Sequence, residues 1–249
     1  MRVAALADIH GNLPALESVL RDVEREQPDL VVFCGDAASG PMPAETIDVL
    51  RAVPRGRHVR GNADRGLIDE FDGKPPGTMP GPFAEWCARQ VDRGQRDFLA
   101  GFESAVAIDG VDGLGDVLFC HAIPGDDTTV FTGETPAERV CALMAGVDAD
   151  VVVCGHTHMQ FDRIVDRLRI VNPGSVGMPY GEPGAYWAML GPDVQLRRVD
   201  YDREAAARRI RQKDWPAAEE FARDNVLGVP SVAEAMEFLR AQEAKQAAR

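Results

Sequence analysis

The chain has 249 residues, of which 45% are hydrophobic and 27% charged, an ordinary composition for a globular protein with a sizeable core. Its formal net charge of −13 argues against nonspecific binding to nucleic acid or to anionic membranes, because no basic patch offsets it. Asp8 interrupts the first apolar run too early for a signal peptide, and no apolar run approaches the length of a membrane span. Five cysteines without CxxC spacing favour a reduced, cytoplasmic protein.

The first quarter of the chain alternates predicted strands with predicted helices. Strands are expected at Arg2–Ala7, Asp29–Cys34 and Arg57–Arg60. One helix is expected to begin near Pro14, and another covers Ala44–Val53. This alternation is typical of a mainly parallel sheet with right-handed crossovers.

The pattern becomes less regular in the middle of the chain. Gly, Pro and Lys dominate from Asp69 to Pro82, which predicts an exposed loop within a lid region of about residues 69–101. The elements expected after this loop are helices Phe83–Arg93 and Gln95–Gly101, strands Ser104–Ile108 and Asp116–Cys120, helix Pro136–Ala145 and strand Asp150–Cys154.

The last third of the chain predicts more strands and two helices. Segments from Phe161 to Val199 are short and broken by Gly or Pro, which indicates a second sheet rich in antiparallel strands. The amphipathic helices Asp202–Lys213 and Val232–Ala248 are expected to cover a sheet face. No internal repeat or long linker divides the sequence, so we expect one domain over residues 1–249, with the C-terminal helices in 202–249.

Polar side chains recur where the predicted strands end. Four of the five histidines, two aspartates and one asparagine follow apolar runs in glycine-containing loops: Asp8, His10, Asp36, Asn62, His121, His156 and His158. The carboxyl ends of strands are where open α/β sheets bind ligands. Imidazole and carboxylate without thiolate suit Mn, Fe, Zn or Ni.

The spacing and the number of these side chains favour two metal ions. In extended backbone, residues i and i+2 point to the same side, so Asp8 and His10 can reach one point, as can His156 and His158. Seven side chains exceed what one ion takes from a protein while leaving room for water and substrate. Two ions roughly 3.5–4 Å apart, sharing a bridging carboxylate, would use them all.

The order of these motifs resembles the calcineurin-like metallophosphoesterase superfamily. The matching blocks lie within roughly residues 1–200 and are Asp8-Ile9-His10, Gly35-Asp36, Gly61-Asn62, Cys120-His121 and Gly155-His156-Thr157-His158. The segment Asn172-Pro173-Gly174-Ser175 is most similar to the small bacterial and archaeal phosphodiesterases of this superfamily. The resemblance implies a four-layer α/β/β/α sandwich of two mixed sheets, with a dinuclear metal site at the strand carboxyl ends.

The resemblance also implies how the ligands divide between the two metals. One set would be Asp8, His10, Asp36 and His158; the other would be Asp36, Asn62, His121 and His156. Asp36 is the only ligand in both sets. The expected cofactors are two divalent ions, with Mn favoured and Fe, Zn, Ni or Mg as alternatives.

The sequence departs from the family pattern at Ala63. Many members have a histidine directly after Gly-Asn, which is the proposed general acid for the leaving group. Alanine cannot transfer a proton, so the roughly 10²–10⁴-fold in rate usually assigned to such a group must come from elsewhere. His58 would lie about 13 Å back along an extended strand, out of reach. Asp64, which would pair with the missing histidine, either orients a water or is a solvated turn residue.

Three residues are candidate substrate contacts by analogy with the family. Asn12 would approach a substrate phosphate or cap the helix that follows it. Asn172 and Ser175 would line the site, although Asn-Pro-Gly also makes a good turn. Phe83 and Trp86, on the expected lid helix, favour apolar packing over substrate stacking.

The favoured function is hydrolysis of a phosphodiester by a hydroxide that bridges the two metals. Without a histidine acid, good leaving groups should react best, so the expected substrate is a small phosphate ester or a nucleotide. The alternatives are a phosphomonoesterase or protein phosphatase, and a metal-binding scaffold with little turnover. Substrate specificity is expected to come from Asp69–Gln95 and from the loop Asp126–Thr135.

Overall fold

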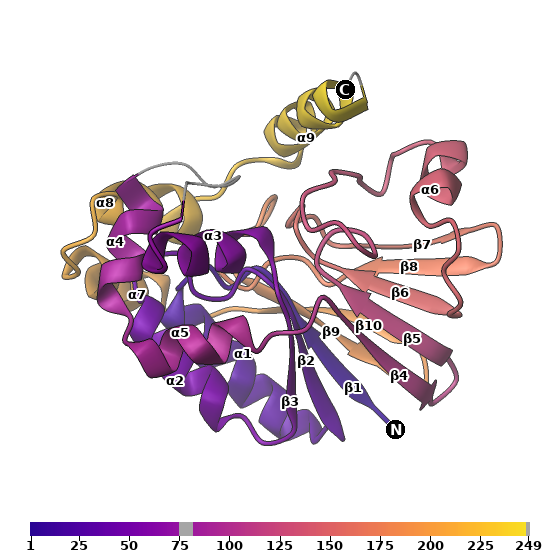
Figure 1. The fold of residues 1–249 in the computed structure, drawn as a ribbon, viewed down its shortest axis with the longest axis horizontal. Helices are drawn as coiled ribbons and strands as arrows, with labels where there is room; N and C mark the ends of the chain where they lie inside the picture. The colour runs from indigo at the N-terminus through magenta and orange to yellow at the C-terminus, as the bar shows by residue number, and fades with distance from the viewer. Residues whose placement is uncertain (75–81, 248–249) are drawn as a thin grey trace.

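Two five-stranded sheets pack face to face in the computed structural model, which describes residues 1–74 and 82–247 (Figure 1). The first sheet has the order β10 (Val194–Val199), β9 (Ala185–Leu190), β1 (Val3–Leu6), β2 (Leu30–Cys34) and β3 (Gly56–Val59). The second has the order β4 (Ala105–Val111), β5 (Gly115–Cys120), β6 (Val151–Cys154), β8 (Leu168–Asn172) and β7 (Phe161–Val165). Each sheet is mixed, since parallel neighbours are flanked by antiparallel strands.

The alternation of side chains along β1 explains the layered core. Val3 and Ala5 pack between the two sheets, whereas Ala4 and Leu6 point to the opposite face and pack beneath helices. All four are fully buried. A strand covered on both faces needs apolar residues at every position, which is why β1 has an uninterrupted apolar sequence.

Helices form the two outer layers. The first sheet is covered by α1 (Leu13–Glu26), α2 (Pro43–Ala52), α5 (Arg93–Ala100) and α7 (Arg203–Arg211). The second sheet is covered by α6 (Ala137–Leu143), whose Val140 packs with Val152 and Ile170. The predicted four-layer α/β/β/α sandwich of two mixed sheets is therefore confirmed.

The remaining helices lie near the strand carboxyl ends (Figure 1). They are α3 (Asn62–Phe71), α4 (Pro82–Gln90), α8 (Ala218–Phe221), which continues as the π-helix η1 (Ala222–Leu227), and α9 (Val232–Ala247). None of the helices in residues 1–74 and 82–247 has the length and apolar character needed to cross a membrane.

Two expectations about the elements need correction. Helix α3 is not among the predicted elements, and it begins at Asn62, within the motif itself. The strands between Phe161 and Val199 do not form a sheet of their own, because β7 and β8 extend the second sheet while β9 and β10 extend the first. Their antiparallel pairing is as predicted. Half of the predicted loop from Asp69 to Pro82 falls in 75–81, outside the described residues.

Helix α9 does not cover a sheet face, so that expectation is wrong for this helix. It lies beyond the strand carboxyl ends, away from both sheets (Figure 1). The side chain of Gln246 on α9 accepts a hydrogen bond from Val130 N and donates one to Thr128 O, both at 2.7 Å. Helix α7 agrees with the expectation, since its Ile210 is buried in the core beside the first sheet.

Candidate metal centre

The predicted ligands lie where strands of the two sheets converge. Asp8 and Asp36 follow β1 and β2 of the first sheet, and His121 and His156 follow β5 and β6 of the second. Each pair of strands runs parallel, so the carboxyl ends open at one edge. A backbone hydrogen bond from Asp8 N to Gly35 O, 3.1 Å long, ties the first two loops together.

The structure brings six of these side chains into two groups, and within each group the ligand atoms lie within 4.8 Å of one another. One group is Asp8, His10 and His158, and the other is Asp36, His121 and His156. Asn62 adjoins the second group, because its side-chain amide lies 3.1 Å from His121 Nε2. Each group belongs to one of the two predicted ligand sets. The difference is Asp36, which is in both predicted sets but in only the second group.

The carboxylate of Asp36 lies between the two groups. Its Oδ1 accepts a hydrogen bond from Ala63 N at 2.8 Å, which fixes the orientation of the carboxylate. Its Oδ2 lies 3.4 Å from His121 Nε2 in its own group and 3.7 Å from His10 Nε2 in the other. One oxygen of Asp36 therefore faces donor atoms of both groups.

The backbone of the site is strained. Among the described residues, eight that are not glycine have a positive φ, and five of these are the candidate ligands Asp8, His10, Asp36, His156 and His158. A side chain in this left-handed region costs about 1 kcal/mol or more. Such strain persists only where the surrounding structure over-determines it, and it concentrates at functional sites.

A backbone carbonyl orients each of the four candidate imidazoles. The pairs are His121 Nδ1 with Cys34 O at 2.8 Å, His158 Nδ1 with Met178 O at 2.8 Å, His156 Nε2 with Thr128 O at 3.1 Å and His10 Nδ1 with Ser39 O at 3.4 Å. In a neutral imidazole, a ring nitrogen that donates to a carbonyl leaves the other nitrogen as an acceptor. Metal-binding histidines are oriented in this way by their outer-shell partners.

The nitrogens left as acceptors face one another. His10 Nε2 and His158 Nε2 are 3.1 Å apart. Burial lowers the pKa of His10 from its ordinary value and lowers the pKa of His158 to about 3, so both rings are neutral near pH 7. Burial likewise lowers the pKa of His156 to about 4. Neutral imidazoles with converging lone pairs fit a divalent cation.

Asp36 needs a positive charge beside it. Burial opposes its ionisation, but the imidazole of His121 outweighs this effect and holds the pKa of Asp36 well below its usual range. Burial also opposes protonation of His121, yet the carboxylate of Asp36 raises the pKa of His121 to about 10. Burial raises the pKa of Asp8 well above its ordinary value. Divalent ions would supply the positive charge that these buried carboxylates require.

Two glycines allow the loops to approach closely. A Cβ on Gly61 would lie 2.1 Å from Asp36 Oδ1, and a Cβ on Gly35 would lie 2.5 Å from His121 Nδ1. Gly35 also has a φ of +90°, which other residues rarely adopt. Both motif glycines are therefore required by the geometry around Asp36.

The three predicted substrate contacts, Asn12, Asn172 and Ser175, are fully buried in the structure. Asn12 accepts from Ala15 N as a helix cap, and its amide donates to Gly177 O.

Asn172 and Ser175 hold the ligand loops in place instead. The amide of Asn172 donates to Gly155 O at 2.8 Å and to Thr157 Oγ1 at 3.1 Å, on either side of His156. The hydroxyl of Ser175 donates to Asp8 O at 2.7 Å. These side chains are positioning residues.

Asp64 is also buried, and its carboxylate joins two ligand loops. One oxygen accepts from Ala37 N at 2.9 Å, and the other accepts from Gly61 N at 3.0 Å. The solvated-turn alternative is wrong, because the side chain has no exposed surface. Both oxygens bind backbone groups, so the role visible in the structure is to hold the Asp36 loop against the start of α3.

His58 lies away from the site, as predicted. Its ring stacks between Phe33 and Phe102, with ring centroids at 5.0 and 4.8 Å, beneath the helices of the first sheet. Ala63 is 1% exposed and carries no group that transfers a proton.

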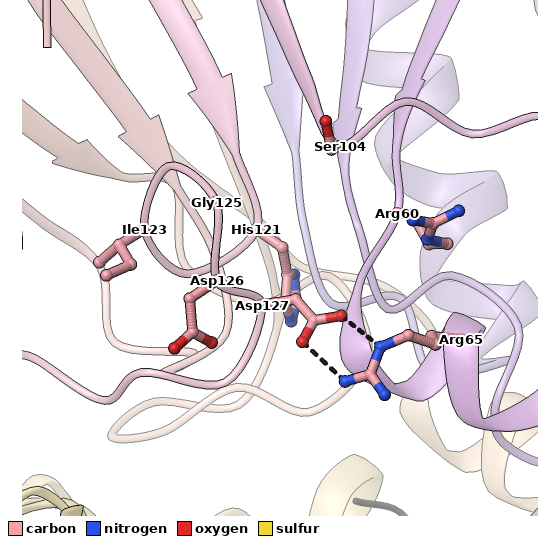
Figure 2. Close-up of a pocket in the computed structure, with 8 residues that line it drawn as sticks. All are labelled: Arg60, Arg65, Ser104, His121, Ile123, Gly125, Asp126 and Asp127. Atoms are coloured by element: carbon pink, nitrogen blue, oxygen red, sulfur yellow. Dashed lines mark hydrogen bonds and ion pairs between the residues drawn. The ribbon is translucent and has the colours of Figure 1, made fainter. Parts of the chain in front are cut away.

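A pocket of about 340 Å³ borders the second group at His121 (Figure 2). Arg60 and Arg65 line it, together with Asp126 and Asp127 from the loop after β5. Arg65 forms a two-pronged ion pair with Asp127, at 2.7 and 2.8 Å. The loop is among the predicted specificity elements, whereas the two arginines are not, although Arg60 directly precedes the Gly61-Asn62 motif. We call this the Arg60 pocket.

A second pocket, of about 300 Å³, borders the first group at His10. Phe83, Trp215 and Phe221 line it, and we call it the α4 pocket. Phe83 packs against Trp215, with 5.8 Å between ring centroids, and keeps 40% of its surface exposed. Trp86 does pack with Trp215, with 6.4 Å between ring centroids.

The chain is similar in sequence to a known family and to several known proteins. Residues 1–193 match the model of the calcineurin-like phosphoesterase superfamily domain. The uncharacterized protein MJ0912 of Methanocaldococcus jannaschii is 24% identical over 234 residues, covering 86% of this chain and 93% of that protein. Phosphodiesterase YfcE of Escherichia coli is 26% identical over 204 residues, covering 78% of this chain and 89% of YfcE.

Solved structures show the same fold. A metallophosphoesterase from Sphaerobacter thermophilus superposes with a TM-score of 0.71 at 24% identity, covering 92% of this chain and 98% of that chain. The hypothetical protein PH1004 from Pyrococcus horikoshii superposes with a TM-score of 0.76 at 20% identity, covering 89% of this chain and 96% of that chain.

Proposed function

Because the chain belongs to the calcineurin-like phosphoesterase superfamily, we propose that it hydrolyses phosphodiesters with two divalent metal ions held by the seven strand-end side chains. The observation that carries this proposal is the position of Asp36 Oδ2, within 3.7 Å of His10 Nε2 and 3.4 Å of His121 Nε2. An oxygen that faces two groups of ligands is where a shared carboxylate belongs. The relative named as a phosphodiesterase, YfcE, supports the choice of reaction.

The donor set fits two ions. One ion would be held by Asp8, His10, Asp36 and His158, and the other by Asp36, Asn62, His121 and His156. The imidazole and carboxylate donors suit Mn, Fe, Zn or Ni, and Mn is the ion to test first. When bound, such ions neutralise charge on phosphoryl oxygens and lower the pKa of a bound water.

The chain's own residues orient this centre. The carbonyls that pair with the four imidazoles hold the rings in one orientation, and Ala63 N holds the Asp36 carboxylate. Position 63 supplies no proton to the leaving group, so the rate should depend strongly on how readily that group departs as an anion. Aryl esters, whose phenolate departs readily as an anion, are therefore favoured over alkyl esters.

The two pockets favour a diester over a monoester. A phosphodiester carries two substituents, whereas a monoester carries one. The α4 pocket borders His10 in one group, and the Arg60 pocket borders His121 in the other. Each substituent of a diester placed between the groups would thus have a pocket beside it.

Hydrolysis of bis(p-nitrophenyl) phosphate tests the proposal, with p-nitrophenyl phosphate as the monoester comparison. We expect activity with Mn²⁺, its loss on chelation, and a decrease of about 10²-fold or more in Asp36→Asn. Asp109→Asn makes the same change at an exposed position on β4 and should keep full activity. Faster turnover of the monoester would make the protein a phosphomonoesterase, and an active Asp36→Asn variant would contradict the metal assignment.

A further inference from the structure

The α4 pocket has aromatic walls from segments far apart in the sequence. Phe83 comes from α4, whereas Trp215 and Phe221 come from the segment after α7. The ring centroids of Trp215 lie 5.8 Å from those of Phe83 and 5.4 Å from those of Phe221. Cys87 and Met178 add apolar surface, so most of the lining is apolar. A concave apolar pocket of this size is typical of a small-molecule site.

The pocket adjoins the first group of candidate ligands. His10 belongs to both the group and the pocket lining. Met178 also lines the pocket, and its carbonyl oxygen pairs with His158 Nδ1 at 2.8 Å. A ligand in the pocket would therefore lie beside two residues that form or orient this group.

Apolar side chains form most of the pocket wall, and Glu220 and Asn225 are polar residues in its lining. Phe83 is 40% exposed, so part of its ring surface is available to a ligand. A flat ring fits these features, because aromatic pairs gain from offset or edge-to-face contact.

The Arg60 pocket has the opposite character. Its four charged side chains, those of Arg60, Arg65, Asp126 and Asp127, suit a polar or charged group. The two pockets border different groups of ligands, so a diester spanning both groups would meet unlike surroundings at its two ends. An apolar substituent would therefore lie in the α4 pocket, and a polar substituent would lie in the Arg60 pocket.

We propose that the α4 pocket binds an uncharged aromatic ring on one ester oxygen of the substrate, while the other substituent is polar. This inference rests on the proposed phosphodiesterase function. The aromatic ring can be an aryl group or a nucleobase, since both present a flat apolar face. Phe83 and Trp215 are the residues assigned to ring recognition.

Two matched pairs of inhibitors test the assignment with Mn²⁺-loaded protein. Phenylphosphonate and methylphosphonate share the phosphonate and differ in the ring; thymidine 5′-monophosphate and 2-deoxyribose 5-phosphate differ in the base. We expect the ring-bearing member of at least one pair to inhibit with a Ki at least tenfold lower, as burial of a ring predicts. A preference in the phosphonate pair indicates that the pocket binds an aryl group, and a preference in the nucleotide pair indicates that it binds a nucleobase.

Variants of the pocket wall give the decisive result. Trp215→Ala should reduce the preference to about threefold or less, while the Ki of methylphosphonate stays unchanged. Phe83→Ala makes a similar change at an exposed side chain, so it serves if Trp215→Ala folds poorly. Phe238→Ala removes an exposed aromatic ring from α9 and should keep the preference.

The outcomes separate this inference from the proposed function. A ring preference that persists in both Trp215→Ala and Phe83→Ala, or no preference in the unmodified protein, would overturn the α4 assignment while ester hydrolysis stands. Failure of the Mn²⁺-loaded protein to hydrolyse any ester would instead refute the phosphodiesterase proposal itself.

Discussion

Replacing His58 by phenylalanine should remove a pH-dependent loss of stability without affecting the metal centre. The imidazole stacks between Phe33 and Phe102, so a phenyl ring can occupy the same space. His58 Nε2 is buried and has no hydrogen-bond partner in the described part of the chain. No hydrogen bond is therefore lost in His58→Phe.

The size of the effect follows from the pKa of His58, which burial lowers from 6.5 to about 4. Between these values the unfolded chain binds more protons than the folded one, so protonation favours unfolding as the pH falls. The full difference of 2.5 pKa units corresponds to about 3 kcal/mol, of which about 2 kcal/mol lies between pH 7 and pH 4.5. On acidification from pH 7 to pH 4.5, the unfolding free energy of His58→Phe should therefore rise by this amount relative to that of the unmodified protein.

Urea denaturation of both proteins at pH 7, 5.5 and 4.5 measures the difference directly. Other titrating groups act equally in both, so only the difference in unfolding free energy is interpreted. Hydrolysis of a phosphodiester by His58→Phe should match that of the unmodified protein. A constant stability difference across this pH range would refute the pKa argument, and a large loss of kcat would show that His58 takes part in the reaction.

Three further changes test how the loops are held. Ser175→Ala should cost about 1–3 kcal/mol, since it leaves Met178 N without its acceptor, while Asp8 O keeps its hydrogen bond from Gly177 N. Calorimetry should show weaker metal binding with KM unchanged. Gly61→Ala should abolish metal binding because its Cβ would lie 2.1 Å from Asp36 Oδ1, whereas Gly146→Ala, at a positive φ with open space, should lower only the melting temperature. Gln246→Ala should speed amide hydrogen exchange at residues 128–130, because Gln246 bonds to Thr128 O and Val130 N. Unchanged exchange would show that α9 does not hold this loop.

Much of the fold follows from the sequence because buried strands produce distinct apolar runs. Strands β1, β2, β5 and β6 carry such runs, and the candidate ligands stand directly after them. Helix α3 is harder to predict, because it begins inside the Gly61-Asn62 motif and its N-terminal cap depends on the buried Asp64. The partners of the later strands are also not local, since β9 pairs with β1 at the other end of the chain.

The side chains that orient the site are harder to separate from those that contact a substrate. Asn172 and Ser175 stand in a turn sequence, and only the folded chain shows that they are fully buried and bonded to the ligand loops. The α4 pocket is likewise invisible in the sequence, because Phe83 and Trp215 meet only after folding. Local patterns identify chemistry at strand ends, but pockets depend on long-range packing.

The most direct test of the account is the number of metal ions bound per chain, measured by Mn²⁺ titration calorimetry with elemental analysis of the same samples. We predict two ions for the unmodified protein. His158→Ala should keep one tightly bound ion, because the group of Asp36, His121 and His156 remains complete. Asp36→Asn should weaken both sites. One ion in the unmodified protein, or two sites of unchanged affinity in Asp36→Asn, would contradict a centre built around the shared carboxylate of Asp36.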